Sequence, residues 1–382
     1  MDDTYIAHTY ARFPIEITSG SGSVVFDSAG KRYIDMGSGI AVNSFGLSDP
    51  VWIKAVTEQM SKVTHTSNLY YTAPDANLAR MLCERTGLRK VFFGNSGAEA
   101  NECAIKVARK YAAQRHGAEY STIVTLWNSF HGRTLTTLSA TGQEHYHELY
   151  QPLTPGFVHA LPNDTADIDR IVAENKVAGI LVECVQGEGG VKPVDPDYLM
   201  HLQKIADDQD IALMIDEVQT GNGRTGTLYA YEQAGLRPDI VTTAKGLGGG
   251  LPIGACLIGE KCADVLQPGD HGSTFGGNPI VCAGAISILE RIDDDLLCEV
   301  RNKSRIIFDK LGQCDAVKEV TGLGLMIGLL PKYRSARTIA DECLNNGVLV
   351  LTAKDRVRLL PALNIPYELL TEALDILIDS CK

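Results

Sequence analysis

Short apolar and β-branched runs alternate with longer helical stretches through the middle of the chain, from about residue 75 to residue 260. Runs of this kind predict strands, and longer stretches with apolar residues three or four positions apart predict helices. The predicted strands are 91–93, 121–127, 179–185, 211–216, 239–243 and 253–259, and the clearest predicted helices are 98–113 and 196–208. Strands separated by helices indicate an α/β fold, with helices on both faces of a mostly parallel sheet. In such folds ligands bind beyond the carboxyl ends of the strands.

The two ends of the chain follow a different pattern. Residues 22–36 predict a β-hairpin, and the last predicted helix carries an apolar stripe at helical spacing between Leu369 and Ile378. Strand and helix are mixed in the C-terminal part, at 319–330, 335–345, 347–351 and 356–360. We therefore predict a large domain at 46–285 and a small α/β domain built from 1–45 and 286–382.

Composition and charge narrow the class of protein. The chain has 382 residues, of which 45% are hydrophobic and 21% charged, as in globular proteins with a large core. Its net charge of −12 argues against nucleic-acid binding, because neutralising phosphates requires a basic surface. No apolar run is long enough to span a membrane, and the start Met1-Asp2-Asp3 lacks the features of a signal peptide.

The cysteines and histidines give no sign of a metal site. The ten cysteines include no Cys-x-x-Cys pair, so we expect reduced thiols in a cytoplasmic protein. His145 and His147 are interpreted as part of a solvated segment rather than as metal ligands.

Three polar groups follow predicted strands. The loop 95–102 opens a helix, where free N–H groups favour a phosphate, and an ordinary helix cap by Ser96 is the alternative. Asp216 ends a strand, and a desolvated acid requires a cation or an N–H donor; a helix cap or salt bridge is the alternative. Lys245 follows a strand and precedes a glycine-rich loop. Desolvation would favour a Schiff-base lysine, and a surface lysine in a flexible loop is the alternative.

Taken together, these groups indicate one cofactor. Asp216 and Lys245 are 29 positions apart, about one strand–helix unit, so both fall at the ends of nearby strands. A phosphate loop, a carboxylate and a Schiff-base lysine are the parts that pyridoxal phosphate requires. In these motifs the sequence resembles the class III (subgroup II) pyridoxal-phosphate aminotransferases, which have fold type I. The resemblance is carried, in family order, by 35–43, 65–71, 95–102, 130–134, 182–190, 216–226, 244–250 and 272–279.

The resemblance implies a set of residues around the cofactor ring. Lys245 would bind the cofactor as a Schiff base, and Asp216 would pair with the pyridine nitrogen. Gln219 would form a hydrogen bond to the ring hydroxyl, while Phe130 and Val218 would pack on opposite faces of the ring.

The resemblance also implies a shared phosphate site. Ser96, Gly97 and Ala98 would hold the phosphate through N–H and hydroxyl groups, and Thr274 would reach the phosphate bound by the other subunit. We therefore expect a homodimer with shared active sites.

Carboxylate recognition is assigned in the same way. Arg133 would bind the substrate carboxylate, with Ser273 beside it, and Arg358 would bind the α-carboxylate of glutamate through two hydrogen bonds. Glu183 would act as a gate that pairs with Arg358 when the other substrate is bound and swings away for glutamate.

The implied reaction moves the terminal amino group of N2-acetyl-L-ornithine to 2-oxoglutarate, a step of arginine biosynthesis. Gly39 falls where ornithine-specific members carry a tyrosine, and a glycine leaves room for an acyl group. The segment 65–71 favours the same substrate. Succinylornithine, succinyl-diaminopimelate, ornithine and 4-aminobutyrate are the alternatives. Segment 45–50 departs from relatives, which usually carry histidines there.

Two other classes of function are weaker. Residues 221–226 match the Gly-x-Gly-x-x-Gly pattern of NAD-dependent oxidoreductases, but the next residues lack a convincing helix face and no acid follows at the usual spacing. A non-catalytic relative would be expected to lose Lys245 or Asp216, and the chain retains both.

Overall fold

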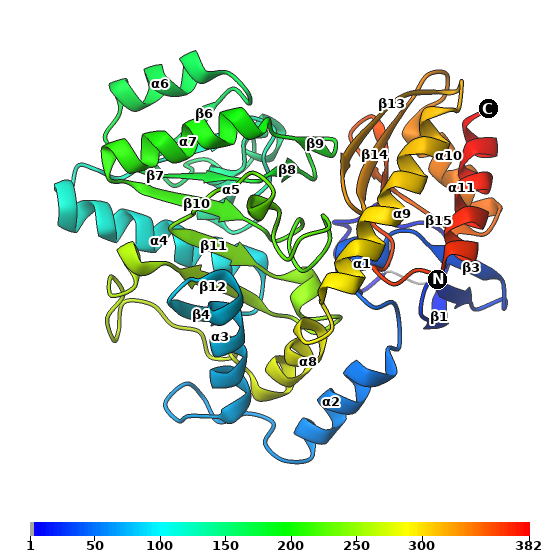
Figure 1. The fold of residues 1–382 in the computed structure, drawn as a ribbon, viewed down its shortest axis with the longest axis horizontal. Helices are drawn as coiled ribbons and strands as arrows, with labels where there is room; N and C mark the ends of the chain where they lie inside the picture. Colours follow the sequence, from blue (N-terminus) through cyan, green and yellow to red (C-terminus); the bar gives the residue numbers. More distant parts are fainter. Residues whose placement is uncertain (1–3) are drawn as a thin grey trace.

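A seven-stranded sheet forms the centre of the computed structural model, which describes residues 4–382 (Figure 1). Its strands, in spatial order, are β4 (Lys90–Gly94), β12 (Gly254–Ile258), β11 (Ile240–Thr243), β10 (Ala212–Asp216), β7 (Val177–Val182), β5 (Thr122–Leu126) and β6 (Phe157–Ala160). Strand β12 is antiparallel to both neighbours, and the other pairs are parallel. The predicted α/β fold with a mostly parallel sheet is confirmed.

Helices cover both faces of this sheet because its side chains alternate between two apolar layers. Ala212 and Met214 pack in a cluster with α4 (Gly97–His116), whereas Leu213 and Ile215 pack in the cluster of the opposite layer. That opposite layer contains α3 (Ala73–Thr86), α6 (Thr165–Glu174), α7 (Pro196–Gln209) and α8 (Pro279–Leu289). Because position 216 continues the even-numbered series, Asp216 faces the same side as α4.

Two four-stranded sheets lie beside the large sheet. One contains β1 (Ile17–Ser21), β2 (Val24–Asp27), β3 (Arg32–Asp35) and β15 (Val348–Leu349), and the other β13 (Val317–Leu323), β14 (Met326–Pro331), β17 (Arg356–Leu359) and β16 (Leu351–Ala353). Strand β15 pairs with β3, so the two ends of the chain share a sheet. In Figure 1 the blue N-terminal strands accordingly lie beside the red C-terminal helix. The domain boundaries at 45 and 285 stay a prediction.

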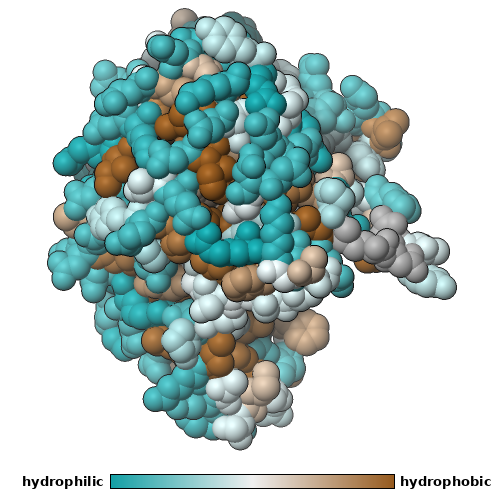
Figure 2. Space-filling view, turned by 90° about the vertical axis from the view of Figure 1, so that its right-hand side faces the viewer, coloured by the Kyte–Doolittle hydropathy of each residue, from teal (hydrophilic) through white to brown (hydrophobic). Residues whose placement is uncertain are grey.

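The C-terminal helices complete this second part of the molecule. A separate apolar cluster joins Ile34 and Met36 to α9 (Asp294–Gly312), α10 (Ala336–Asn345) and α11 (Tyr367–Cys381). Figure 2 shows the face over these C-terminal elements as mainly hydrophilic, with apolar residues interspersed. The remaining α-helices and strands are α1 (Ser38–Ala41), α2 (Pro50–Met60), α5 (Leu135–Ala140), β8 (Val185–Gln186) and β9 (Lys192–Pro193).

Several sequence predictions differ from the structure in detail. The predicted strand 179–185 stops at Val182, and the chain then forms the short β8–β9 hairpin. The stretch 319–330 is a hairpin of β13 and β14. Among residues 4–382 no helix is long and apolar enough to cross a membrane. The predicted absence of a signal peptide at Met1-Asp2-Asp3 lies outside the described residues.

Close backbone packing around Gly254 gives a testable prediction. A Cβ at Gly254 would lie 1.9 Å from the carbonyl oxygen of Ser96, so β12 and the loop before α4 touch backbone to backbone. We expect Gly254→Ala to force them apart and to reduce the free energy of unfolding by about 2 kcal/mol. Thermal denaturation measures this. Gly312→Ala is the control, because a Cβ there meets nothing within 4 Å; an equal loss of stability in both variants would contradict the prediction.

Candidate active site

A cavity of about 510 Å³ lies at the carboxyl ends of the parallel strands, as expected for this fold. The segments that follow β4, β5, β7, β10 and β11 all contribute to its lining. The lining residues are Val42, Asn95, Ser96, Gly97, Ala98, Asn101, Phe130, His131, Gly132, Arg133, Glu183, Asp216, Val218, Gln219, Ala244, Lys245, Gly250, Leu251, Pro252 and Ile253. The structure therefore brings together every predicted site residue except Ser273, Thr274 and Arg358.

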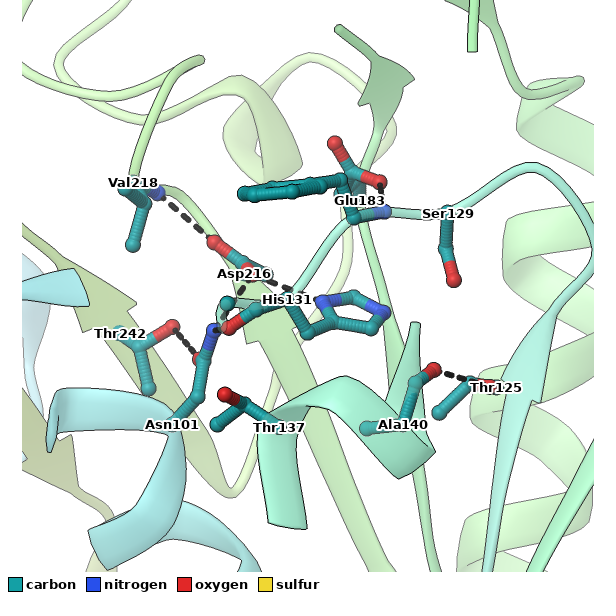
Figure 3. Close-up of polar contacts among 12 residues, drawn as sticks. Asn101, Thr125, Ser129, His131, Thr137, Ala140, Glu183, Asp216, Val218 and Thr242 are labelled. Carbon is teal, nitrogen blue, oxygen red and sulfur yellow. Dashed lines mark hydrogen bonds and ion pairs between the residues drawn. The ribbon is translucent and has the colours of Figure 1, made fainter. Parts of the chain in front are cut away.

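Asp216 is held by three hydrogen-bond donors (Figure 3). Its Oδ2 accepts from Asn101 Nδ2 and from His131 Nδ1, each at 2.8 Å, and its Oδ1 accepts from the Val218 N–H at 3.0 Å. The side chain is only 4% exposed, so these donors replace the water that a carboxylate would otherwise bind. Because a carboxylate oxygen has two acceptor sites, Oδ1 retains capacity for a ligand in the cavity.

Lys245 enters the same cavity from the end of β11. Its backbone φ is +45°, a left-handed conformation that is uncommon for a lysine and is typical of strained functional positions. Burial lowers the pKa of the Lys245 ammonium, the nearby Arg358 acts in the same direction, and the carboxylates of Glu188, Asp216 and Glu183 oppose them. A lowered pKa makes the free amine more accessible, which is the form that attacks a carbonyl carbon.

The N-terminus of α4 forms one end of the cavity. Ser96 caps the helix, since its Oγ accepts from the Glu99 N–H at 3.2 Å. The helix cap that the sequence offered as the alternative to a phosphate site is therefore present. The first N–H groups of a helix nevertheless have no partner within it, and those of Gly97 and Ala98 remain suited to an anion. A Cβ at Gly97 would lie 2.7 Å from Val218 Cγ1, so a glycine is required for this close approach.

Two aromatic rings position Arg133, whose side chain is exposed at the cavity. The Arg133 guanidinium lies over the Tyr146 ring, 4.1 Å from its centroid, and over the Phe130 ring at 5.5 Å. Such stacking directs a guanidinium while leaving its N–H groups free for a carboxylate.

Ser273 and Thr274 do not line the cavity of their own chain. Ser273 Oγ accepts from Asn95 Nδ2 at 3.2 Å and from the Gly276 N–H at 2.9 Å, which holds its loop beside the cavity. Thr274 is exposed at the surface.

Arg358 pairs with a different acid from the one predicted. Its Nη1 donates to Glu188 Oε1 at 2.5 Å and to Gln219 Oε1 at 3.2 Å, while its buried Nε has no partner among residues 4–382. Glu183 instead accepts from the N–H groups of Phe130 and Gly187 at 2.9 and 3.2 Å. Arg358 therefore pairs with Glu188 in this structure, and the pairing of Glu183 with Arg358 when the other substrate is bound stays a prediction.

The position of each acid explains why Glu188, and not Glu183, meets Arg358 in this structure. Glu183 directly follows β7, so its carboxylate stays beside the loop after β5; Glu188 lies in the turn between β8 and β9. Burial raises the pKa of Glu183 to about 7, against the opposing effects of His131 and the two N–H donors.

The pattern Gly-x-Gly-x-x-Gly at 221–226 lacks the context of a dinucleotide site. Turns follow it instead of a helix, up to a three-residue 3₁₀ turn at Ala230–Glu232. Arg224 within it is buried and donates to the carbonyl oxygens of Leu325 and Pro361, so the loop serves packing against the C-terminal part.

Comparison with known proteins agrees with the geometry. The sequence model of the family Aminotransferase class-III matches residues 5–380. The chain is a class-III aminotransferase. Acetylornithine aminotransferase of Haemophilus ducreyi is 50% identical over 99% of this chain and 96% of its own length. Acetylornithine aminotransferase of Methanocaldococcus jannaschii is 43% identical over 96% of this chain and 94% of its own.

Solved structures of related aminotransferases have the same fold. Ornithine aminotransferase of Toxoplasma gondii has a TM-score of 0.95 at 31% identity and covers 100% of this chain and 93% of its own. N-acetylornithine aminotransferase of Stenotrophomonas maltophilia has a TM-score of 0.85 at 36% identity, with 97% and 96% covered. The predicted fold type, enzyme class and family are therefore confirmed.

The cofactor of this aminotransferase is pyridoxal phosphate, as in its family. A T. gondii ornithine aminotransferase structure is described with this cofactor at the active site. The cavity fits such a group: it presents a helix N-terminus for a phosphate, Asp216 with spare acceptor capacity, and the amine of Lys245. The roles of the individual residues stay predictions.

Some cavity residues were not singled out as site residues from the sequence. Asn101 lies four positions after Gly97, which is about one helical turn, so it faces the cavity from the same side of α4. Leu251, Pro252 and Ile253 enter from the loop before β12. Glu188 belongs to a quoted family segment, and only the folded hairpin shows that it, rather than Glu183, meets Arg358.

Glu217 has a structural role that makes stability depend on pH. Its carboxylate is fully buried, accepts from Thr220 Oγ1 at 2.5 Å and from the Tyr231 N–H at 2.8 Å, and does not line the cavity. Burial raises the pKa of Glu217 from 4.5 to about 7, against these donors. The folded state therefore binds more protons than the unfolded state between those values, and stability falls as pH rises through that window.

We expect Glu217→Gln to flatten this dependence, because glutamine fits the site without an ionisation. Its amide can accept from the Tyr231 N–H and donate to the Thr220 hydroxyl. Urea denaturation from pH 5 to pH 8 measures the free energy of unfolding. This free energy should fall less steeply with pH in the variant than in wild type, and the two slopes should differ by at most the contribution of one bound proton. Glu290→Gln, at an exposed position, is the control. Parallel pH profiles for wild type and Glu217→Gln would contradict the assignment.

Proposed function

We propose that this aminotransferase moves the terminal amino group of N2-acetyl-L-ornithine to 2-oxoglutarate, and so produces N-acetyl-L-glutamate 5-semialdehyde and L-glutamate for arginine biosynthesis. The observation that carries the chemistry is the meeting of Lys245 and Asp216 in one cavity. The substrate is supported by relatives of up to 50% identity that are named acetylornithine aminotransferases. Succinylornithine, succinyl-diaminopimelate, ornithine and 4-aminobutyrate are the alternative amine donors.

The protein's own residues divide the work at the cavity. When bound, pyridoxal phosphate supplies an aldehyde that takes up the amino group and a ring that accepts electrons. Lys245 would hold the group through its aldehyde carbon, and the amine of Lys245 would move the proton of the amine-bearing carbon. Asp216 would accept a hydrogen bond from the ring nitrogen, Gly97 and Ala98 would donate N–H groups to the phosphate, and Phe130 would cover one ring face.

Two arginines distinguish the two substrates in this proposal. Arg133, exposed at the cavity, binds the carboxylate of acetylornithine. Arg358 binds the α-carboxylate of glutamate or 2-oxoglutarate after releasing Glu188. Gly39 leaves room for the acyl group, although it does not line the cavity within its own chain.

We infer a homodimer with shared sites and a cytoplasmic location. The exposed Thr274 would reach the phosphate of the partner's cofactor. Asn68 donates to the carbonyl oxygens of Ser273 and Gly276, so the segment after it adjoins the loop of Thr274. The side chains of Tyr70, Tyr71 and Phe275 in these two segments are largely exposed, and large exposed apolar side chains of this kind favour an interface. All ten cysteines are free thiols, which suits a reducing compartment.

A half-reaction panel tests the proposal. Holoenzyme is mixed with acetylornithine, succinylornithine, ornithine, 4-aminobutyrate or succinyl-diaminopimelate, and the loss of the cofactor absorbance band is followed. We expect acetylornithine to have the highest specificity constant and Lys245→Ala to show no turnover with any donor. A different preferred donor would overturn the substrate assignment, and turnover by Lys245→Ala would overturn the mechanism.

A second prediction concerns the separation of the two half-reactions. Arg358→Ala removes a charged donor pair for the α-carboxylate, so we expect the glutamate half-reaction to slow by about 100-fold. The acetylornithine half-reaction should change by less than about 3-fold, because Arg133 remains. Single-turnover rates at saturating cofactor measure both, and equal losses would contradict the division.

A further inference from the structure

Three separate elements meet behind Asp216. Asp216 ends β10, and its register partner on the neighbouring parallel strand β11 is Thr242. Paired positions on parallel strands point to the same face of a sheet, and on this face lies α4, which carries Asn101 in its second turn. Asn101 is 1% exposed and Thr242 is fully buried, so neither side chain can rely on solvent.

The hydrogen bonds of Asn101 define a single orientation of its amide (Figure 3). Nδ2 donates to the carbonyl oxygen of His131 and to Asp216 Oδ2, both at 2.8 Å, which uses both of its hydrogens. Oδ1 accepts from Thr242 Oγ1 at 2.7 Å. A rotated amide would place Oδ1 against a carbonyl oxygen and a carboxylate and would leave the threonine hydroxyl facing N–H groups.

His131 cannot hold Asp216 in place as Asn101 does. Its ring nitrogen Nδ1 donates to Asp216, but its buried Nε2 has no hydrogen-bond partner among residues 4–382. The polar contact that directs the ring is therefore the one to Asp216 itself. Asn101, in contrast, is tied independently to β11 and to the backbone of the loop after β5.

We propose that Thr242 and Asn101 are positioning residues: Thr242 fixes the amide of Asn101 so that its N–H holds Asp216 Oδ2 and leaves Oδ1 for the ring nitrogen of the cofactor. This inference rests on the proposed function. Thr242 does not line the cavity and acts only through Asn101. Without its hydroxyl, Asn101 Oδ1 is buried with no donor, and the amide loses the contact that ties it to β11.

The experiment compares Thr242→Val with Thr242→Ser. Valine has nearly the same shape without the hydroxyl, whereas serine retains it. For Thr242→Val we expect the dissociation constant of added pyridoxal phosphate from apoenzyme to rise about 5- to 10-fold and kcat to fall by a similar factor, as for one lost hydrogen bond. KM for 2-oxoglutarate should stay within about 2-fold, because Arg133 and Arg358 are unchanged. Thr242→Ser should restore both values to within about 2-fold of wild type.

Thr225→Val is the matched control. Its hydroxyl is also buried but has no hydrogen-bond partner among residues 4–382, and Thr225 does not line the cavity. Equal effects of Thr225→Val and Thr242→Val would overturn the inference. Failure of Thr242→Ser to restore cofactor affinity would also overturn it, since packing would then be the cause. Apoenzyme melting temperatures identify a variant that fails to fold. If Thr242→Val fails to fold, Asn101→Ala tests the inference instead, and it is expected to weaken cofactor binding at least as much. Wild-type apoenzyme that does not bind pyridoxal phosphate would instead refute the proposed function, and this inference with it.

Discussion

A carboxylate buried at the end of a strand is the constraint on which the rest of the site depends. Asp216 has almost no contact with solvent, and an acid in such a place requires donors from the protein. The donors come from three segments: Asn101 on α4, His131 in the loop after β5, and the N–H of Val218. The same contacts therefore hold a helix, a loop and the sheet in one arrangement around the cavity.

The parallel sheet explains how residues distant in the chain converge on this point. Strands β10 and β11 are parallel neighbours, so Asp216 at the end of one lies near Lys245, just beyond the end of the other. Alternation along β10 decides which helix meets the acid, since Ala212 and Met214 pack in the layer of α4 and Asp216 continues that series. Glu217, one position later, points to the opposite face of the sheet. Its carboxylate accepts from the Tyr231 N–H instead of facing the cavity.

Sequence patterns predict the strands and helices of this molecule better than the contacts between its side chains. Strand ends identified Asp216 and Lys245, because an acid or a lysine directly after an apolar run is unusual. Strand β1 was missed, since Ile17–Ser21 contains one large apolar residue and no alternation. The pair of Asn101 and Thr242 is 141 positions apart and depends on strand register, which no local pattern encodes. Glu183 and Glu188 follow the same strand, and only the conformation of the β8–β9 turn decides which one reaches Arg358.

The environment of Arg358 supports the proposed use of one cavity by two substrates. The side chain is 3% exposed, so its charge requires an anion at all times, and Glu188 provides one. That pairing uses Nη1 and leaves the buried Nε without an acceptor. A substrate carboxylate that accepts from Nε and from Nη2, the nitrogen on the same side of the guanidinium as the Nε hydrogen, would satisfy a donor that Glu188 leaves unpaired. A substrate with no carboxylate at that end offers no replacement anion, so Glu188 stays and the cation remains neutralised. The choice is therefore between two anions for one buried cation, and neither state leaves the Arg358 cation unpaired.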